Sequence, residues 1–78
     1  MLAGIPDLML PQRSGAYSGL FIEMKQKDNR PTTTQADMLL ALRQNNYAAF
    51  WCDSFEDAQH LIVNYLKGKI DDNRNTLP

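Results

Sequence analysis

The chain has 78 residues and a formal net charge of −1, with eight lysines and arginines against nine aspartates and glutamates. This length allows one domain with a marginal core, because a domain of about 60 residues buries only about 60% of the surface of its unfolded chain. A net charge this close to zero excludes a protein that is basic over its whole surface. Any contact with nucleic acid therefore has to be made by a local group of basic residues. No apolar run approaches the roughly 20 residues that span a bilayer, which excludes a membrane partner and indicates a soluble, intracellular protein.

Two strands joined by a loop are predicted at the start of the chain. Asp7–Leu10 is a short apolar run between two prolines, and Ser14-Gly15 then marks a loop. Tyr17–Lys25 is the strongest strand pattern in the sequence, and the two runs together predict an antiparallel hairpin. Alternation along the second strand separates two faces, one with Leu20, Ile22 and Met24 and the other with Phe21, Glu23 and Lys25.

A helix is predicted from Pro31 to Gln44. Proline suits a first helical turn and Thr32 is an acceptable N-cap, while Asn45-Asn46 ends the pattern. Residues 38–42 are apolar almost all the way round, which predicts that the helix is covered on more than one side. In so small a chain with a single cysteine, the second cover would be another subunit, so we expect a homodimer.

A third strand and a second helix complete the predicted fold. Tyr47–Cys52 is a continuous apolar run, as expected of a buried strand parallel to its neighbour. Ser54 begins a helix that ends at Gly68, and its apolar face contains Ala58, Leu61, Ile62 and Tyr65. The sequence therefore predicts an α/β domain over residues 1–68, strand–strand–helix–strand–helix with a three-stranded mixed sheet, and a polar, flexible tail over residues 69–78.

The candidate chemistry lies on the polar face of the second strand. Glu23 and Lys25 are two residues apart, so they project from the same face about 6.7 Å apart along the strand. Asp7 begins the preceding strand, and an antiparallel hairpin brings its carboxylate beside Glu23. Two neighbouring carboxylates repel each other unless a cation lies between them, and hard divalent ions such as Mg²⁺ prefer oxygen ligands. A lysine there can orient a metal-bound water or offset charge on a phosphate, which suits hydrolysis of a phosphodiester.

Simpler interpretations of the same residues remain. Glu23 and Lys25 would form the solvated face of an edge strand, where such pairs contribute little. His60 has no second histidine or cysteine at a ligand spacing, so it is expected to be structural or on the surface. The remaining residues of interest are expected in the core: Cys52 as a small hydrophobe, and Tyr17, Phe50 and Trp51 as aromatic packing residues.

Three segments in succession carry a resemblance to a known family. Gly4–Leu8 (Gly-Ile-Pro-Asp-Leu), Phe21–Lys25 (Phe-Ile-Glu-Met-Lys) and Asn29–Gln35 (Asn-Arg-Pro-Thr-Thr-Thr-Gln) resemble the motifs of the VRR-NUC domain. This domain is a branch of the PD-(D/E)xK nuclease superfamily, found in phages, bacteria and a eukaryotic DNA-repair nuclease. The similarity extends over roughly Leu2 to Lys67 and implies a small restriction-endonuclease-like core.

The resemblance implies a role for each matching position. Asp7 and Glu23 would be metal ligands, with the backbone carbonyl of Met24 as a third oxygen ligand for Mg²⁺ or Mn²⁺. Lys25 would be the catalytic lysine that positions the attacking water. Gln35 matches the family glutamine at the start of the helix, which would face the same cleft. Its alternative role is that of a polar residue at the end of an apolar stripe.

Nucleic-acid contacts are expected beside this cluster. Lys27 and Arg30 lie in the loop before the helix, and Thr32 and Thr34 lie at its start, where helix N-termini favour anions such as phosphate. The alternative is that these are ordinary solvated loop residues.

The implied function is a metal-dependent endonuclease that hydrolyses DNA, in particular branched DNA such as four-way (Holliday) junctions, during phage or bacterial replication and repair. It would act in the cytoplasm of a bacterial or phage-infected cell, as a homodimer that presents two cleavage sites to a symmetric junction. The chain departs from the family by lacking the usual N-terminal helix with its further acidic residue. A partner chain covers that gap, or an upstream segment is missing, or the three residues Asp7, Glu23 and Lys25 suffice. The alternative function is a catalytically weak or inactive dimeric module that binds nucleic acid or protein.

Overall fold

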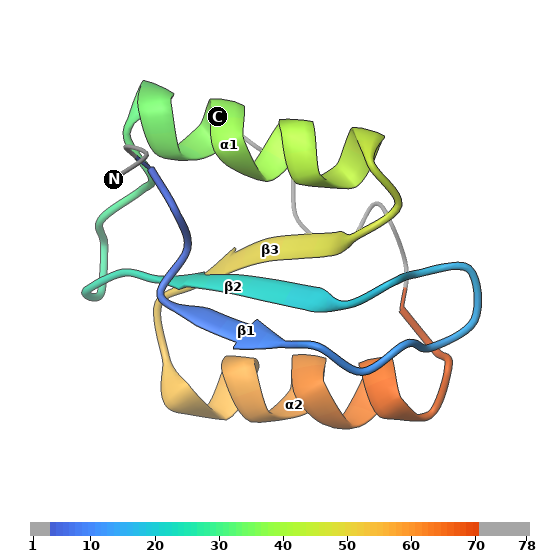
Figure 1. Ribbon diagram of the computed structural model, residues 1–78. Helices are drawn as coiled ribbons and strands as arrows, with labels where there is room; N and C mark the ends of the chain where they lie inside the picture. Colours follow the sequence, from blue (N-terminus) through green and yellow to red (C-terminus); the bar gives the residue numbers. More distant parts are fainter. Residues whose placement is uncertain (1–3, 71–78) are drawn as a thin grey trace.

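The computed structural model describes residues 4–70 and forms three layers, with one helix on each face of a small sheet (Figure 1). The elements in chain order are β1 (Leu8–Leu10), β2 (Leu20–Met24), α1 (Thr33–Gln44), β3 (Ala48–Cys52) and α2 (Phe55–Leu66). The sheet order is β1-β2-β3, with β1 antiparallel and β3 parallel to β2. The predicted strand–strand–helix–strand–helix order and the mixed three-stranded sheet are therefore confirmed.

The strands are shorter than their sequence patterns predicted. β2 begins at Leu20 rather than Tyr17, because the backbone of Tyr17 exchanges two hydrogen bonds of 3.0 Å with Ser14 and closes the loop as an isolated bridge. At Gly19 the chain passes close to the backbone of β1. A Cβ at this position would lie 3.1 Å from the carbonyl oxygen of Leu10. β1 begins at Leu8, which leaves Asp7 just ahead of the strand.

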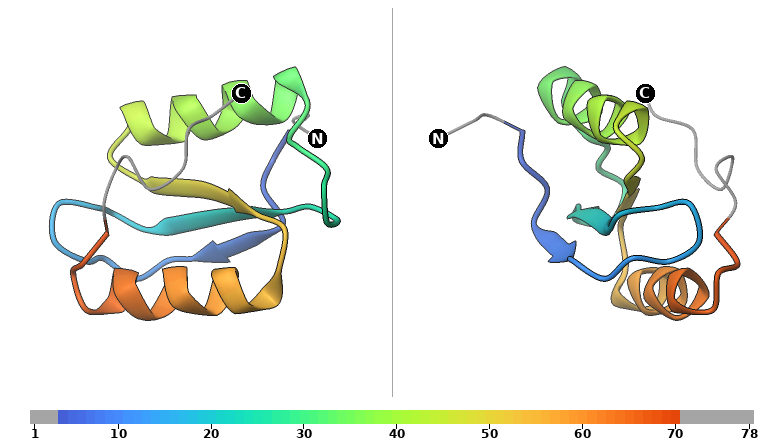
Figure 2. Two further views of the ribbon diagram at one scale, coloured as in Figure 1. Left: turned by 180° about the vertical axis from the view of Figure 1, so that it is seen from behind. Right: turned by 45° about the vertical axis from the view of Figure 1, so that its right-hand side comes forward.

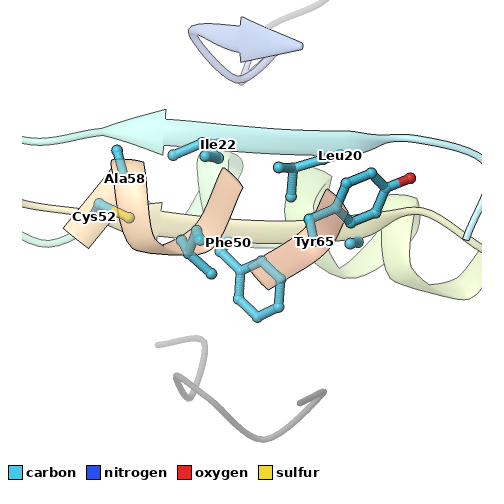
Figure 3. Packing of buried hydrophobic residues seen from close by; sticks show 8 residues of the cluster. Leu20, Ile22, Phe50, Cys52, Ala58 and Tyr65 are labelled. Carbon is cyan, nitrogen blue, oxygen red and sulfur yellow. The ribbon is translucent and has the colours of Figure 1, made fainter. Parts of the chain in front are cut away.

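The main core lies between the sheet and α2 (Figure 3). The side chains that point to this face alternate along β2 and β3, and they meet the predicted apolar face of α2. The largest of these buried side chains are Leu20, Ile22, Phe50, Leu61 and Tyr65. Cys52 is also buried here, as expected of a small hydrophobe.

The opposite face of the sheet is covered by α1 through a smaller contact. Ala36 and Leu39 are buried on this side, and Ala49 of β3, which is also buried, alternates onto the face away from the main core. Leu40 is 48% exposed, so the helix is not enclosed within residues 4–70 as its apolar sequence predicted. Thr32 is the N-cap and Asn45 is the C-cap, as predicted. The helix itself begins at Thr33, so Pro31 precedes the cap and does not lie in the first helical turn as predicted. Neither α1 nor α2, the two helices within residues 4–70, is long and apolar enough to cross a membrane.

The loop between β1 and β2 is tied to the end of α2. The Tyr65 hydroxyl donates a hydrogen bond to the backbone carbonyl of Gln12, and the Ser14 hydroxyl donates to the carbonyl of Tyr65. Ile70 packs against the core just beyond α2. The rest of the predicted flexible tail, residues 71–78, lies outside the described residues.

Replacing Tyr65 with phenylalanine tests this link. The variant loses the hydrogen bond to Gln12 and keeps the buried ring, so we expect a loss of about 1 kcal/mol in the free energy of unfolding. For a domain of this size that corresponds to a fall of about 4–8 °C in melting temperature. Thermal unfolding followed by circular dichroism measures it. Tyr47→Phe is the matched control. The Tyr47 ring packs edge-on against Phe21, and its hydroxyl has no hydrogen bond within residues 4–70. An equal fall in melting temperature in both variants would contradict a stabilising hydrogen bond from Tyr65 to Gln12.

Candidate active site

The residues predicted to carry the chemistry gather at one end of the sheet. β2 and β3 end there, β1 begins there, and both helices begin there, as the left side of Figure 1 and, from behind, the right side of the left view of Figure 2 show. In open α/β sheets, ligands bind outside the carboxyl ends of the parallel strands. The starts of α1 and α2 also direct their positive dipole ends toward this region, which favours an anionic ligand.

Asp7 is held at this end by a glycine and by the edge of β2. Gly4 has φ +82, and a Cβ there would lie 2.8 Å from the Thr34 carbonyl oxygen, so only glycine allows the chain to pass this close to α1. The chain then reaches Asp7, whose Oδ2 accepts a hydrogen bond of 2.9 Å from the backbone N–H of Met24. The Gly-Ile-Pro-Asp segment thus crosses the start of α1 and delivers a carboxylate to the end of β2.

Glu23 is a buried carboxylate beside Asp7. It lies on the central strand and is 4% exposed, so the interpretation of Glu23 and Lys25 as a solvated edge-strand face is wrong. Burial raises the pKa of Glu23, and the negative charge of Asp7 raises this pKa further, whereas the positive charge of Lys25 lowers it. The net effect is a raised pKa, which means that the ionised form of Glu23 lacks sufficient compensation from the protein alone.

Gln35 connects Glu23 to Lys25. Its Nε2 donates to Oε2 of Glu23 at 3.2 Å, and its Oε1 accepts from Nζ of Lys25 at 3.1 Å. The same Oε1 accepts from the backbone N–H of Thr32 at 2.9 Å, and the Thr32 hydroxyl accepts from the N–H of Gln35 at 3.2 Å. This reciprocal capping box fixes Gln35 at the helix start, so the cap of α1 also orients the acidic and basic groups of the site.

The oxygen donors at this end fit a hard divalent cation. Asp7 and Glu23 supply carboxylates, and the Met24 carbonyl faces the same edge as its N–H, because both groups of a strand residue point to one side. Within residues 4–70, no group of three or more histidine, cysteine or acidic side chains is arranged so that it could hold a metal ion. The donor set is therefore two carboxylates and a backbone carbonyl, which suits Mg²⁺ because this ion keeps several water ligands.

The four residues predicted to bind nucleic acid differ in the contacts that they already make in the protein. Lys27, Arg30, Thr32 and Thr34 are all exposed, although Thr32 is already used as the helix cap. The guanidinium carbon of Arg30 lies 5.9 Å from the centroid of the Trp51 ring. Arg30 is thereby held on the face that carries Glu23.

Trp51 was assigned to the core from sequence, and the structure places it differently. It pairs with Glu23 across β2 and β3, is only half-buried, and lies under Arg30. The apolar run Tyr47–Cys52 has no polar residue to reveal its alternation. Neighbouring side chains of a strand point to opposite faces, so Trp51 lies on the face opposite to that of the buried Phe50.

A carboxylate pair, a lysine and a bridging glutamine at the end of a mixed α/β sheet are the arrangement of a nuclease-type domain. The family model of the VRR-NUC domain matches residues 1–56, and the chain belongs to this family. A solved structure described as a "VRR_NUC domain protein" is 31% identical and superimposes with a TM-score of 0.83. The match covers 92% of this chain and 61% of that one, so this chain spans less than two thirds of its length. No curated protein matches the sequence.

Gln35→Ala tests the bridge between Glu23 and Lys25. The variant removes the amide that orients both groups, and loss of such outer contacts usually lowers metal affinity or activity by about 10- to 100-fold. We expect a fall of that size in the rate of the metal-dependent DNA cleavage proposed below, measured across a Mg²⁺ titration. Gln44→Ala, at an exposed glutamine in the last turn of the same helix, is the control. Equal rates for the two variants would show that the bridge has no part in catalysis.

Proposed function

We propose that this VRR-NUC domain is a metal-dependent endonuclease that hydrolyses DNA phosphodiesters, with Mg²⁺ or Mn²⁺ held by Asp7, Glu23 and the carbonyl of Met24. The observation that carries the proposal is the buried Glu23 carboxylate beside Asp7, linked through Gln35 to Lys25. A protein that keeps two carboxylates this close, one of them buried, gains most when a cation binds between them.

Each residue of the candidate site has a separate role in the proposed hydrolysis of a phosphodiester. A bound divalent ion supplies a Lewis acid for the phosphate and lowers the pKa of a water molecule. Asp7 and Glu23 bind the ion, and Gln35 keeps the Glu23 carboxylate oriented. Lys25 uses one donor on Gln35, and since an ammonium has three donors it retains capacity for a phosphate oxygen or a water. Lys25 would thus orient the nucleophile or offset charge that develops on the phosphate.

We further propose branched DNA, in particular four-way junctions, as the substrate and a homodimer as the acting species. The dimer is proposed because residues 38–42 make α1 apolar on more than one side, and Leu40 on this helix is 48% exposed within residues 4–70. A two-fold dimer would present two sites to a symmetric junction. Analytical ultracentrifugation with and without junction DNA tests this arrangement, and a monomer in both conditions would exclude it.

Arg30 is proposed to bind a backbone phosphate from its position over Trp51. Each phosphate contact releases counterions, so Arg30→Ala should weaken DNA binding and reduce the slope of log K against log salt by about 1. The salt dependence of DNA binding is measured by fluorescence anisotropy in the presence of chelator, over about 50 to 200 mM salt. Arg13→Ala is the control, because Arg13 lies in the loop at the opposite end of the sheet. A slope that changes equally in both variants would exclude a specific contact at Arg30.

Cleavage with and without metal tests the proposed activity. Purified protein is incubated with supercoiled plasmid and with a labelled four-way junction, in Mg²⁺, Mn²⁺ or chelator. We expect nicked or linear plasmid and resolved junction with either metal, and no product with chelator. Binding that survives chelation, with no product under any metal, would instead support the alternative of an inactive binding module.

A further inference from the structure

An exposed aromatic side chain lies beside the candidate active site. Phe55 is the first residue of α2 and is 80% exposed, the largest value among the large hydrophobic side chains of residues 4–70. The backbone that carries it is fixed, because the preceding Ser54 caps the helix by accepting a hydrogen bond from the N–H of Asp57 at 3.1 Å. Burying a phenyl ring contributes about 1.5–3 kcal/mol, and the chain forgoes this gain at Phe55.

Phe55 forms one wall of a groove that leads to the catalytic residues. The groove is a shallow, open depression of the surface with a volume of about 390 Å³. One wall comes from the end of β2 and the loop after it, with Met24, Lys25 and Lys27. The other wall comes from the turn after β3, with Asp53, Ser54 and Phe55. We refer to this space as the Phe55 groove.

The groove shares two residues with the candidate active site. Lys25 is the lysine held by Gln35, and Met24 is the residue whose N–H binds Asp7. A ligand in the Phe55 groove therefore lies beside Lys25, next to the place where the proposed function puts the scissile phosphate. The ligand and the substrate of the site are expected to be parts of one molecule.

The charged and aromatic side chains that line the groove indicate which kind of ligand it binds. Two lysines against one aspartate favour an anion, and an accessible aromatic ring offers a stacking surface. This combination of cationic groups and an aromatic platform is how proteins bind single-stranded nucleic acid without reading its sequence. The bases of a continuous duplex are stacked on each other, so only an unpaired base exposes a face to a phenyl ring.

We propose that the Phe55 groove binds one unpaired nucleotide next to the scissile phosphate, with its phosphate toward Lys25 and Lys27 and its base stacked on Phe55. The proposal rests on the proposed nuclease function and restricts the branched DNA of that proposal to branch points with an unpaired nucleotide, so that a fully paired four-way junction has to open a base pair to fill the groove. DNA with an unpaired nucleotide at the cleavage position should bind better than continuous duplex. Phe55 is then a specificity residue that takes no part in the chemical step.

Binding without metal tests the groove separately from cleavage. Fluorescence anisotropy with a single-stranded oligothymidine and with a duplex of equal length is measured in chelator. Stacking contributes about 1–3 kcal/mol per base, so Phe55→Ala should weaken single-strand binding by about 5- to 150-fold and leave duplex binding unchanged. Phe55→Trp should retain single-strand binding. Leu66→Ala is the control, since Leu66 is a 55% exposed apolar residue at the other end of α2.

Each outcome separates this inference from the proposed activity. If the wild type cleaves DNA but Phe55→Ala binds the single strand as tightly as the wild type, the groove inference is overturned and the nuclease function stands. If the wild type cleaves nothing but single-strand binding depends on Phe55, the groove is supported and the catalytic proposal fails. Equal weakening of single-strand and duplex binding in Phe55→Ala overturns the inference, because stacking on an unpaired base cannot produce it. Melting curves of all variants verify that each is folded.

Discussion

Lys25→Ala is expected to lower the rate of the proposed metal-dependent DNA cleavage by about 10²- to 10³-fold, the usual effect of removing one group that stabilises charge in the transition state. The Lys25 ammonium is the only cation that the described residues attach to the Glu23–Gln35 pair. Its removal also takes away the charge that lowers the pKa of Glu23, so the carboxylate becomes harder to ionise. Both effects act against catalysis in the same direction.

The measurement is the single-turnover rate on a labelled junction at saturating metal, which separates chemistry from binding. Lys67→Ala is the matched control, because it removes the same charge at the far end of α2. Lys25→Arg keeps the charge with a different geometry, and it should recover little activity because a planar guanidinium does not replace an ammonium. Full activity in Lys25→Ala, with activity that still requires metal, would place the chemistry elsewhere in the protein.

The fold was largely predictable because its local signals agree with its packing. The alternation in β2 identified the face that meets α2, and Thr32 with Asn45 identified both ends of α1. The start of β2 was predicted too early, because Tyr17 is typical of strands and its pairing with Ser14 depends on the turn between them. Local propensity is a weak guide where a loop competes for the same backbone groups.

The candidate site was predictable as a set of residues but not as a connected network. The spacing of Glu23 and Lys25 placed them on one face, whereas the burial of Glu23 depends on how α1 packs over the sheet. The role of Gln35 depends on two separate conditions, a capping box within the helix and contacts across to β2. The Thr32-x-x-Gln35 spacing of a capping box can be read from the sequence, and it is the signal that sequence reasoning missed. The contacts across to β2 depend on how α1 packs on the sheet and have no such signal.

The exposure of Phe55 could not be predicted for a related reason. A phenylalanine just after a helix cap resembles a core residue, and the apolar stripe of α2 begins only three positions later, at Ala58. Its orientation away from the core is set by how the turn Asp53–Ser54 leads from β3 into the helix. The functional inference at Phe55 therefore comes from the tertiary structure alone.

Glu23→Gln is expected to make the metal-free protein more stable at neutral pH while abolishing cleavage. The pKa of Glu23 is raised above its ordinary value of 4.5, so the folded state binds the proton more tightly than the unfolded chain does. Stability of the metal-free wild type therefore falls as the pH rises from 4.5 through the raised pKa, and the full cost is present above it. Glutamine has nearly the same shape, carries no charge, and its amide oxygen can still accept from Gln35. The variant should melt at a higher temperature than the wild type at neutral pH, and this component of the pH dependence should disappear.

Added metal should reverse the order of stability. A ligand that binds only the folded state at 100 times its dissociation constant contributes about 2.7 kcal/mol, which for a domain of this size raises the melting temperature by roughly 10–20 °C. The wild type should show this rise with Mg²⁺ or Mn²⁺, and Glu23→Gln should show little of it because one carboxylate ligand is gone. Asp37→Asn, which removes an exposed acidic charge on α1, is the control and should respond to metal like the wild type. A wild type less stable than Glu23→Gln both with and without metal would mean that Glu23 is not a ligand. Its buried charge would then have no compensating partner, and the nuclease proposal would lose its main support.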